Sequence, residues 1–254
     1  MVLKADGTNC EAETHEAFKL GGGNPEIVMV NQLKNREKNL LDYQILAMPG
    51  GFAYGDDLGA GKILALELQS YLADQINEFT QRKNGLIIGI CNGFQALVRT
   101  GLLPLGTIGE IKAILDVNNS GKFDCRPVKL KVQEDNACVF LQDIKGIKEF
   151  KVAHGEGRFY TSQETLDKVE MQRQVVFRYC DVDGNPTQKY PENPNGSMNS
   201  IAAICDSTGR ILGIMPHPER AVKKTQYDNW RRMGDFKPEG LQIFEKMVNY
   251  AKQM

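Results

Sequence analysis

Short apolar runs alternate with amphipathic segments along the first hundred residues of the chain. Runs of branched and aliphatic side chains are typical of buried strands, and an apolar residue at every third or fourth position is typical of a helix. On these patterns, strands are predicted at Glu26–Asn31, Tyr43–Met48 and Gly85–Ile90. Helices are predicted at Glu11–Leu20 with Thr8 or Asn9 as cap, at Lys62–Phe79, and at Gln95–Thr100 ended by Gly101. Strands that alternate with helices predict a parallel sheet covered on both faces.

The second half of the chain shows short apolar runs separated by turns. Strands are predicted at Pro127–Val132, Val139–Gln142, Phe150–Ala153, Val175–Tyr179, Ile201–Cys205 and Ile211–Met215. Turns are predicted at Asp183-Gly184 and Asn195-Gly196. A last helix is predicted at Leu241–Ala251, with Ile243, Phe244, Met247 and Val248 on its apolar face. Because no repeat or linker divides the chain, we expect one α/β domain over residues 1–254, with a mixed sheet that carries antiparallel additions.

The charge and hydropathy of the chain argue against two classes of partner. Its 254 residues include 31 Lys and Arg against 32 Asp and Glu, a formal net charge of -1. This balance gives no general attraction to nucleic acid or to an anionic membrane, so neither is expected to bind. Apolar stretches such as Leu86–Ile90 are too short to span a bilayer, and the first ten residues lack the apolar core of a signal peptide.

The six cysteines follow no disulfide or metal-binding pattern. They lie at positions 10, 91, 125, 138, 180 and 205, without a CxxC pair and without histidines at metal-ligand spacing. We therefore expect no metal site. Free thiols without a framework are typical of a reducing compartment, which predicts a cytoplasmic protein.

The segment Gly89-Ile90-Cys91-Asn92-Gly93 has the form of a nucleophile elbow between a predicted strand and a predicted helix. Such a turn holds its central residue in a strained conformation, and its glycines leave room where strand and helix meet. The sulfur then lies at a helix N-terminus, which favours a thiolate. Cys91 is therefore a candidate nucleophile, although a small buried Cys after a core strand is an equally ordinary structural residue.

Two histidine–glutamate pairs are candidates for the base and its orienting carboxylate. His217-Pro218-Glu219 follows the predicted strand Ile211–Met215, and its prolines favour an extended chain in which residues two apart point the same way. His154-Gly155-Glu156 has the same spacing after another predicted strand, but its glycine allows more freedom. His15 lies in a predicted helix and is expected at the surface. Spacing alone leaves both pairs open.

A glycine-rich loop, PGGFAYGDDLGAGK at residues 49–62, follows the predicted strand Tyr43–Met48. It departs from a phosphate-binding loop, because Ile63 replaces the Ser or Thr that binds magnesium and because Asp56 and Asp57 repel phosphate. We interpret it as a loop whose exposed N–H groups stabilise an oxyanion, with Gly50 and Gly51 allowing close approach of the backbone. An ordinary loop at a strand end is the alternative.

Taken together, these motifs occur in the order typical of class I glutamine amidotransferases. The longer strings PGGFAYGDDLGAGK, GICNGFQ, AHGEGRF, NPNGS and MPHPERA resemble the glutaminase subunits of phosphoribosylformylglycinamidine synthase, a family of purine biosynthesis. The resemblance runs from Gly7 to the final helix. It implies a flavodoxin-like α/β fold, with a mostly parallel central sheet flanked by helices.

The resemblance also implies roles for individual residues. Cys91 would attack the side-chain amide of glutamine, His217 would transfer the proton to ammonia, and Glu219 would orient His217. The residues that would bind the substrate or its oxyanion are Gly50, Gly51, Asn92 and Gln95. The roles of His154, Glu156 and Arg158 stay open, either near the site or at the interface with a synthetase.

The family implies partners rather than a cofactor in this chain. Ammonia would pass to a large synthetase subunit, which uses ATP and magnesium to convert formylglycinamide ribonucleotide to formylglycinamidine ribonucleotide, and a small third subunit would complete the complex. Two alternatives remain. The chain could be a class I glutaminase that serves another synthetase, or a regulatory subunit that is non-catalytic or senses oxidants through its thiol.

Overall fold

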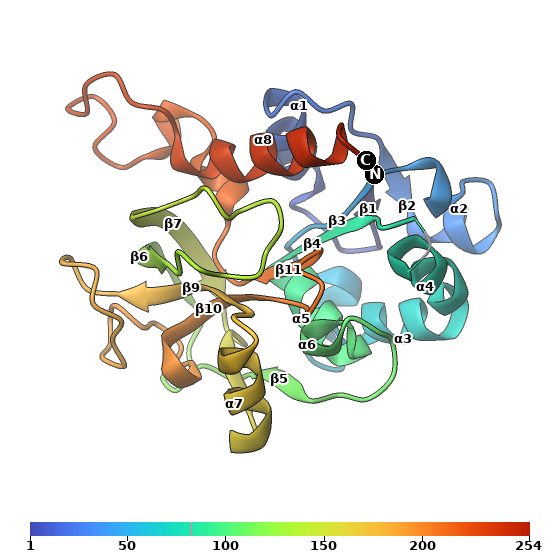
Figure 1. Ribbon diagram of the computed structural model, residues 1–254, viewed down its shortest axis with the longest axis horizontal. Coiled ribbons are helices and arrows are strands. Elements are labelled where there is room, and N and C mark those ends of the chain that lie inside the picture. The colour runs from blue at the N-terminus through green and yellow to red at the C-terminus, as the bar shows by residue number, and fades with distance from the viewer. Residues whose placement is uncertain (82) are drawn as a thin grey trace.

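The computed structural model describes residues 1–81 and 83–254 (Figure 1). Its described strands build one large sheet in the order β2-β1-β3-β4-β11-β10-β9-β6-β7. The first five are parallel: β1 (Val2–Lys4), β2 (Ile27–Met29), β3 (Ile45–Met48), β4 (Leu86–Ile90) and β11 (Ile211–Ile214). The other four pair antiparallel: β10 (Ile201–Cys205), β9 (Val175–Cys180), β6 (Asp124–Val132) and β7 (Ile147–His154). A separate antiparallel ribbon contains β5 (Ala113–Asp116) and β8 (Arg158–Thr161).

Helices lie on both faces of the parallel half of the sheet. Those helices are α1 (Glu11–Leu20), α2 (Val30–Lys34), α3 (Lys62–Tyr71), α4 (Ala73–Gln81), α5 (Asn92–Thr100), α6 (Leu102–Leu105) and α8 (Glu239–Ala251). In Figure 1, α1 and α8 lie together on one side of the sheet, and α3, α5 and α6 lie on the other. Helix α7 (Gln163–Met171) lies beside the antiparallel half near β5. The predicted covered sheet and the antiparallel additions are therefore present.

Two strands at the centre of the sheet carry the chain toward the candidate site. Every residue of β4 and β11 is buried, as expected of strands covered on both faces. Their register pairs Ile90 with Ile214, so the residues that follow these strands emerge side by side. On the other side of β4, Met48 at the end of β3 pairs with Gly89. The carboxyl ends of β3, β4 and β11 thus lie at one edge of the sheet.

Several predicted elements have other bounds in the structure. The strand predicted at Glu26–Asn31 is shorter, because helix α2 begins at Val30. The helix predicted at Lys62–Phe79 is divided at Leu72, whose backbone leaves the helical region at a φ of -120°. Its predicted apolar face is nevertheless buried, and so is the predicted face of α8. Helix α5 begins three residues before Gln95, directly after Cys91.

Two local predictions are wrong. Residues Val139–Gln142 form turns and no strand, because the chain folds on itself through hydrogen bonds such as Leu141 N–H to the Cys138 carbonyl, and the apolar side chains enter the core without pairing. Neither Thr8 nor Asn9 caps α1; the cap position is Cys10, and the Thr8 hydroxyl accepts a bond from the Ala5 N–H instead. No helix of the described residues combines the length and apolar character that crossing a membrane requires.

Candidate active site

The predicted strand-to-helix turn is present at Cys91. This residue has φ 51° and ψ -104°, between the last residue of β4 and the first of α5. The flanking glycines are required by space. A Cβ on Gly93 would lie 2.0 Å from the Met48 carbonyl oxygen, and one on Gly89 would lie 2.7 Å from the Gly93 carbonyl. Strand and helix therefore approach each other too closely for any other residue at these two positions.

The Cys91 side chain is enclosed by segments from distant parts of the chain. It is 5% exposed. Its backbone N–H donates to the Ile214 carbonyl at 2.8 Å, which fixes the turn to the end of β11. The Sγ atom lies 3.6 Å from the Ala153 carbonyl oxygen, at the end of β7, and donates a hydrogen bond to it. The thiol is thus held at the N-terminus of α5 between two other strand ends.

His217 and Glu219 form a buried pair beside this thiol. The Nδ1 atom of His217 lies 2.5 Å from Oε1 of Glu219, and the side chains are 1% and 0% exposed. The His217 backbone is fixed by its N–H, which donates to the Lys151 carbonyl at 2.8 Å. A Cβ on Gly50 would lie 2.7 Å from Cε1 of His217 and 3.3 Å from Cβ of Cys91. Gly50, Cys91 and His217 are therefore mutual neighbours, and the three sequence motifs meet at one point.

The electrostatic surroundings of His217 favour its protonated form. Burial disfavours the imidazolium, but the charges of Glu219 and Cys91 outweigh burial and raise the pKa of His217 to about 10. Nε2 of His217 is buried, and among the described residues it has no hydrogen-bond partner. The Cys91 sulfur is thus near enough to contribute to the raised pKa of His217.

Cys10 lies behind this pair, a contact that the sequence did not reveal. Its Sγ, a nitrogen of His217 and an oxygen of Glu219 lie within 4.8 Å of one another. Such a set of donors suits zinc in principle. However, the Arg220 guanidinium donates to this sulfur at 3.1 Å, and burial and the Glu219 charge raise the pKa of the thiol. A cation at the sulfur and a protonated thiol both oppose metal binding, so we do not interpret this cluster as a metal site.

The glycine-rich loop is fixed on two sides. Gly51 has a φ of 119°, and its backbone forms a bridge with Thr8. Further along, the Asp56 carboxylate accepts hydrogen bonds from the Asn92 amide at 2.9 Å and from the Gly61 N–H at 3.3 Å. Burial of Asp56 raises its pKa. Because the Asn92 side chain bonds to Asp56, the loop is attached to the first residue of α5.

Gln95 and Glu156 connect the same helix to the segment after β7. The Gln95 amide donates to the Glu156 backbone carbonyl at 2.6 Å and accepts from Asn92 at 3.1 Å. The Glu156 carboxylate accepts from the Ala60 N–H at 3.2 Å and lies 3.6 Å from the Arg99 guanidinium. Glu156 therefore bonds to the glycine-rich loop and not to its sequence neighbour His154.

The second histidine–glutamate pair is not assembled as a pair. His154 is 3% exposed, and its ring lies between Asn118 and Asn195, at 3.1 Å and 3.4 Å. Burial and the charge of His217 lower its pKa to about 4. Arg158 turns to the β5–β8 ribbon, where it forms an ion pair with Asp116. Among the candidate pairs, the structure joins His217 to Glu219 and separates His154 from Glu156.

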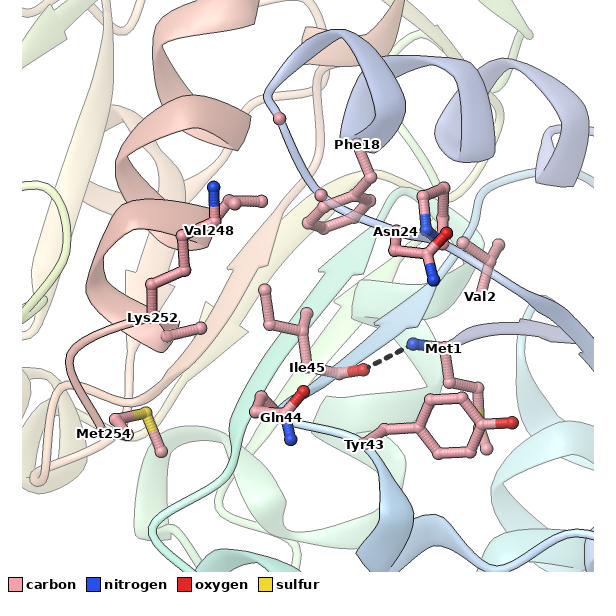
Figure 2. Close-up of a pocket in the computed structure, with 14 residues that line it drawn as sticks. Met1, Val2, Phe18, Asn24, Tyr43, Gln44, Ile45, Val248, Lys252 and Met254 are labelled. Carbon is pink, nitrogen blue, oxygen red and sulfur yellow. Dashed lines mark hydrogen bonds between the residues drawn. The ribbon is translucent and has the colours of Figure 1, made fainter.

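A cavity of about 510 Å³ lies at the amino-terminal ends of the parallel strands, away from Cys91 (Figure 2). Its walls include Phe18 of α1, Val248 of α8, and Ile45 at the start of β3. The Met1 amino group donates to the Ile45 carbonyl at 2.8 Å in this cavity. Because β3 runs from Ile45 to Met48, the cavity and the Cys91 site are at opposite ends of the parallel strands.

Comparisons with known proteins agree on one family. Residues 1–251 match the family model of the CobB/CobQ-like glutamine amidotransferase domain. A curated relative from Dehalococcoides mccartyi, phosphoribosylformylglycinamidine synthase subunit PurQ, is 46% identical over 100% of this chain and 98% of its own length. The protein of the same name from Treponema denticola is 44% identical over 90% of each chain.

One solved structure supports the same family, and a second supports the fold. A chain of the PurLQS structure from Thermotoga maritima is 31% identical, covers 98% of this chain and 96% of its own, and superposes with a TM-score of 0.73. The glutaminase domain of Trypanosoma brucei CTPS is 12% identical over 99% of this chain and 93% of its own, with a TM-score of 0.59. At that identity the second likeness concerns the fold alone.

Proposed function

The chain belongs to the family of CobB/CobQ-like glutamine amidotransferases, and from that premise we propose that it is the glutaminase subunit of phosphoribosylformylglycinamidine synthase. The curated relatives that carry this name match the chain over nearly its full length. The structural observation that carries the proposal is the meeting of Gly50, Cys91 and His217, with Glu219 bonded to the far side of the imidazole. This is the arrangement of a nucleophile, a base and an orienting carboxylate.

In the proposed reaction, Cys91 attacks the side-chain amide carbon of glutamine. The positive charge of His217 stabilises the negative charge on the sulfur before attack, because the two groups are neighbours in a buried site. His217 then gives its proton to the departing ammonia, which leaves a thioester on Cys91. Water, deprotonated by His217, attacks the thioester and releases glutamate. Glu219 holds the ring through Nδ1, so that Nε2 is the nitrogen that handles the proton.

The oxyanion of each tetrahedral intermediate is bound by backbone N–H groups in this proposal. Asn92 is the first residue of α5, where N–H groups point away from the helix and attract negative charge. Gly51 contributes a second N–H from the glycine-rich loop. Gln95 lies one turn further along α5 and positions the substrate. The attachment of the loop to Asn92 through Asp56 supports this assignment, because it holds both donors in one rigid unit.

The ammonia is used outside this chain. We propose that it passes to a large synthetase subunit that consumes ATP with magnesium and aminates formylglycinamide ribonucleotide, and that a small third subunit completes the complex. The likeness to a chain of PurLQS supports such an assembly. We place the protein in the cytoplasm as one domain over residues 1–254, and we propose no metal or cofactor site of its own.

The proposal is tested by measuring glutamate release from glutamine in the reconstituted complex. We expect Cys91→Ala and His217→Ala each to abolish release. Cys125→Ala is a matched control, since Cys125 is an exposed free thiol, and it should retain activity within about twofold. Release that persists in Cys91→Ala would remove the nucleophile from the proposal.

The same complex separates the alternatives. A glutaminase that serves another synthetase would release glutamate but would not form the amidine from formylglycinamide ribonucleotide and ATP. A non-catalytic subunit would release no glutamate under any condition. A thiol sensor would react with peroxide at Cys91 without turning over glutamine.

A further inference from the structure

His154 is a buried titratable side chain to which the proposed mechanism assigns no step. Both of its ring nitrogens are occupied: Nδ1 lies 3.1 Å from Oδ1 of Asn118, and Nε2 lies 3.4 Å from Nδ2 of Asn195. An amide oxygen only accepts hydrogen bonds and an amide nitrogen only donates them. The ring is therefore neutral, with its proton on Nδ1.

The orientation of both amides is fixed by backbone groups. The Asn118 amide nitrogen donates to the carbonyls of Lys122 and His154, each at 2.9 Å, so its oxygen must face the ring. The Asn195 amide oxygen accepts from the Ser197 N–H at 3.0 Å, so its nitrogen must face the ring. The tautomer of His154 follows from these contacts.

The segment 153–158 is folded around this ring. Gly157 lies so close that a Cβ there would be 2.5 Å from the imidazole, and its N–H donates to the same Asn118 oxygen at 3.0 Å. The Gly155 carbonyl accepts from the Asn118 N–H at 2.8 Å. The ring and Asn118 together thus fix the path of the chain between Ala153 and Arg158.

This segment contacts the candidate site at two points. The Ala153 carbonyl accepts the hydrogen bond of the Cys91 thiol, and the Glu156 carbonyl accepts that of the Gln95 amide at 2.6 Å. A shift of the segment would therefore move a partner of the nucleophile and a partner of the substrate-positioning residue together. Displacements of about 1 Å at such contacts cost on the order of 100-fold in rate.

We propose that His154 is a positioning residue of the glutaminase site, which holds residues 153–158 against Cys91 and Gln95 through its hydrogen bonds to Asn118 and Asn195. The inference rests on the proposed glutaminase function. In this role, His154 makes no contact with the substrate and transfers no proton. The role also explains why the buried ring bonds to the amides of Asn118 and Asn195 and does not face Glu156.

Two variants separate hydrogen bonding from simple filling of space. His154→Leu keeps the volume and removes both bonds, and His154→Asn keeps a donor that can reach the Asn118 oxygen. In the complex, we expect His154→Leu to lower kcat/KM for glutamine by on the order of 100-fold and His154→Asn by less than about tenfold. If packing were the only role, His154→Asn would lose more kcat/KM than His154→Leu. That result would overturn the inference.

Gln174→Ala is the matched control for loss of buried hydrogen bonds. The Gln174 amide is 2% exposed and donates to the carbonyls of Pro104 and Cys205, far from Cys91 in the fold. This variant should keep kcat/KM within about twofold at a temperature where it is folded. Equal losses in Gln174→Ala and His154→Leu would show a general effect of destabilisation and would contradict the inference.

A second measurement does not depend on glutaminase activity. The rate at which iodoacetamide alkylates Cys91, followed by mass spectrometry, should rise at least about threefold in His154→Leu, because the thiol loses its acceptor. It should not change in Gln174→Ala. An unchanged rate in His154→Leu would contradict the positioning role, whereas a wild-type complex that releases no glutamate would overturn only the proposed function. Should His154→Leu not fold, Asn118→Ala removes the same anchor and is expected to change the rate in the same direction.

Discussion

The Nδ1 atom of His217 lies 2.5 Å from Oε1 of Glu219, and together the two side chains are almost fully buried. A hydrogen bond this short between a cation and an anion is charge-assisted, and it fixes both the tautomer and the plane of the imidazole. In the proposed mechanism, this orientation leaves Nε2 of His217 to give its proton to the departing ammonia.

Replacement of Glu219 by Gln should reduce catalysis without disturbing the shape of the site. The neutral amide removes one of the charges that raise the pKa of His217, so the imidazolium becomes less stable. We expect kcat to fall by roughly 10²- to 10⁴-fold and the alkaline limb of the kcat/KM profile to move to lower pH. Glu16→Gln, an exposed partner of Lys223, is the control and should leave both unchanged.

The chain alone should be a slower glutaminase than the assembled complex. In the structure, the Cys91 thiol donates to the Ala153 carbonyl, so the sulfur must leave this acceptor before it can attack as a thiolate. We expect kcat in glutamate release to rise at least about tenfold when the synthetase is added. Full activity of the isolated chain would show that the thiol leaves Ala153 without help.

Loss of stability in mild acid should depend on His154. Its folded-state pKa of about 4 lies below the unfolded value of 6.5, so between these values only the unfolded chain binds the proton. The free energy of unfolding therefore falls by about 3 kcal/mol as pH drops from 6.5 to 4, because of this group. In urea unfolding, His154→Asn should lose less free energy of unfolding than the wild type between pH 7 and pH 4. Parallel plots of this free energy against pH for the two proteins would contradict the assignment.

The nucleophile turn should tolerate no side chain at Gly93. A Cβ there would lie 2.0 Å from the Met48 carbonyl oxygen, so β3 and α5 must separate. We expect Gly93→Ala to destabilise the fold by several kcal/mol, on the order of 3. A Cβ on Gly234 meets no atom within 4 Å, and Gly234→Ala should change the free energy of unfolding by less than about 0.5 kcal/mol. Similar midpoints for the two variants would show that strand and helix can separate freely.

The sequence predicted the parts of the site that depend on local chain geometry. The elbow at Cys91 needs glycines at fixed positions. The contact between His217 and Glu219 is also present, but the extended chain predicted for it is wrong, because Pro218–Ala221 form a short 3-10 helix that begins directly after His217. These constraints act within a few residues, so they are visible in a short string. The bounds of β4, β10 and α8 followed for the same reason, because their patterns are dense and continuous.

The residues that the sequence did not reveal act across long distances. Cys10 lies near Glu219, Arg99 forms an ion pair with Glu156, and Asn118 bonds to His154. No periodic pattern in the sequence connects any of these pairs. The wrong strand at Val139–Gln142 has a related cause. An apolar run shows that a segment enters the core, but whether it pairs with a strand depends on neighbours that the run does not contain.

The parallel register of β4 and β11 also determines when the enzyme can first act during its own synthesis. Ile90 directly precedes Cys91 and pairs with Ile214, shortly before His217, and the antiparallel half of the sheet is made from chain that is synthesised between them. In a nascent chain, Cys91 is therefore synthesised long before His217. No imidazole from this pair can lie beside Cys91 until the ribosome has passed Glu219. Partial translation products and truncations that end before His217 should thus be unable to consume glutamine, since closing this long-range pairing is a late step in folding.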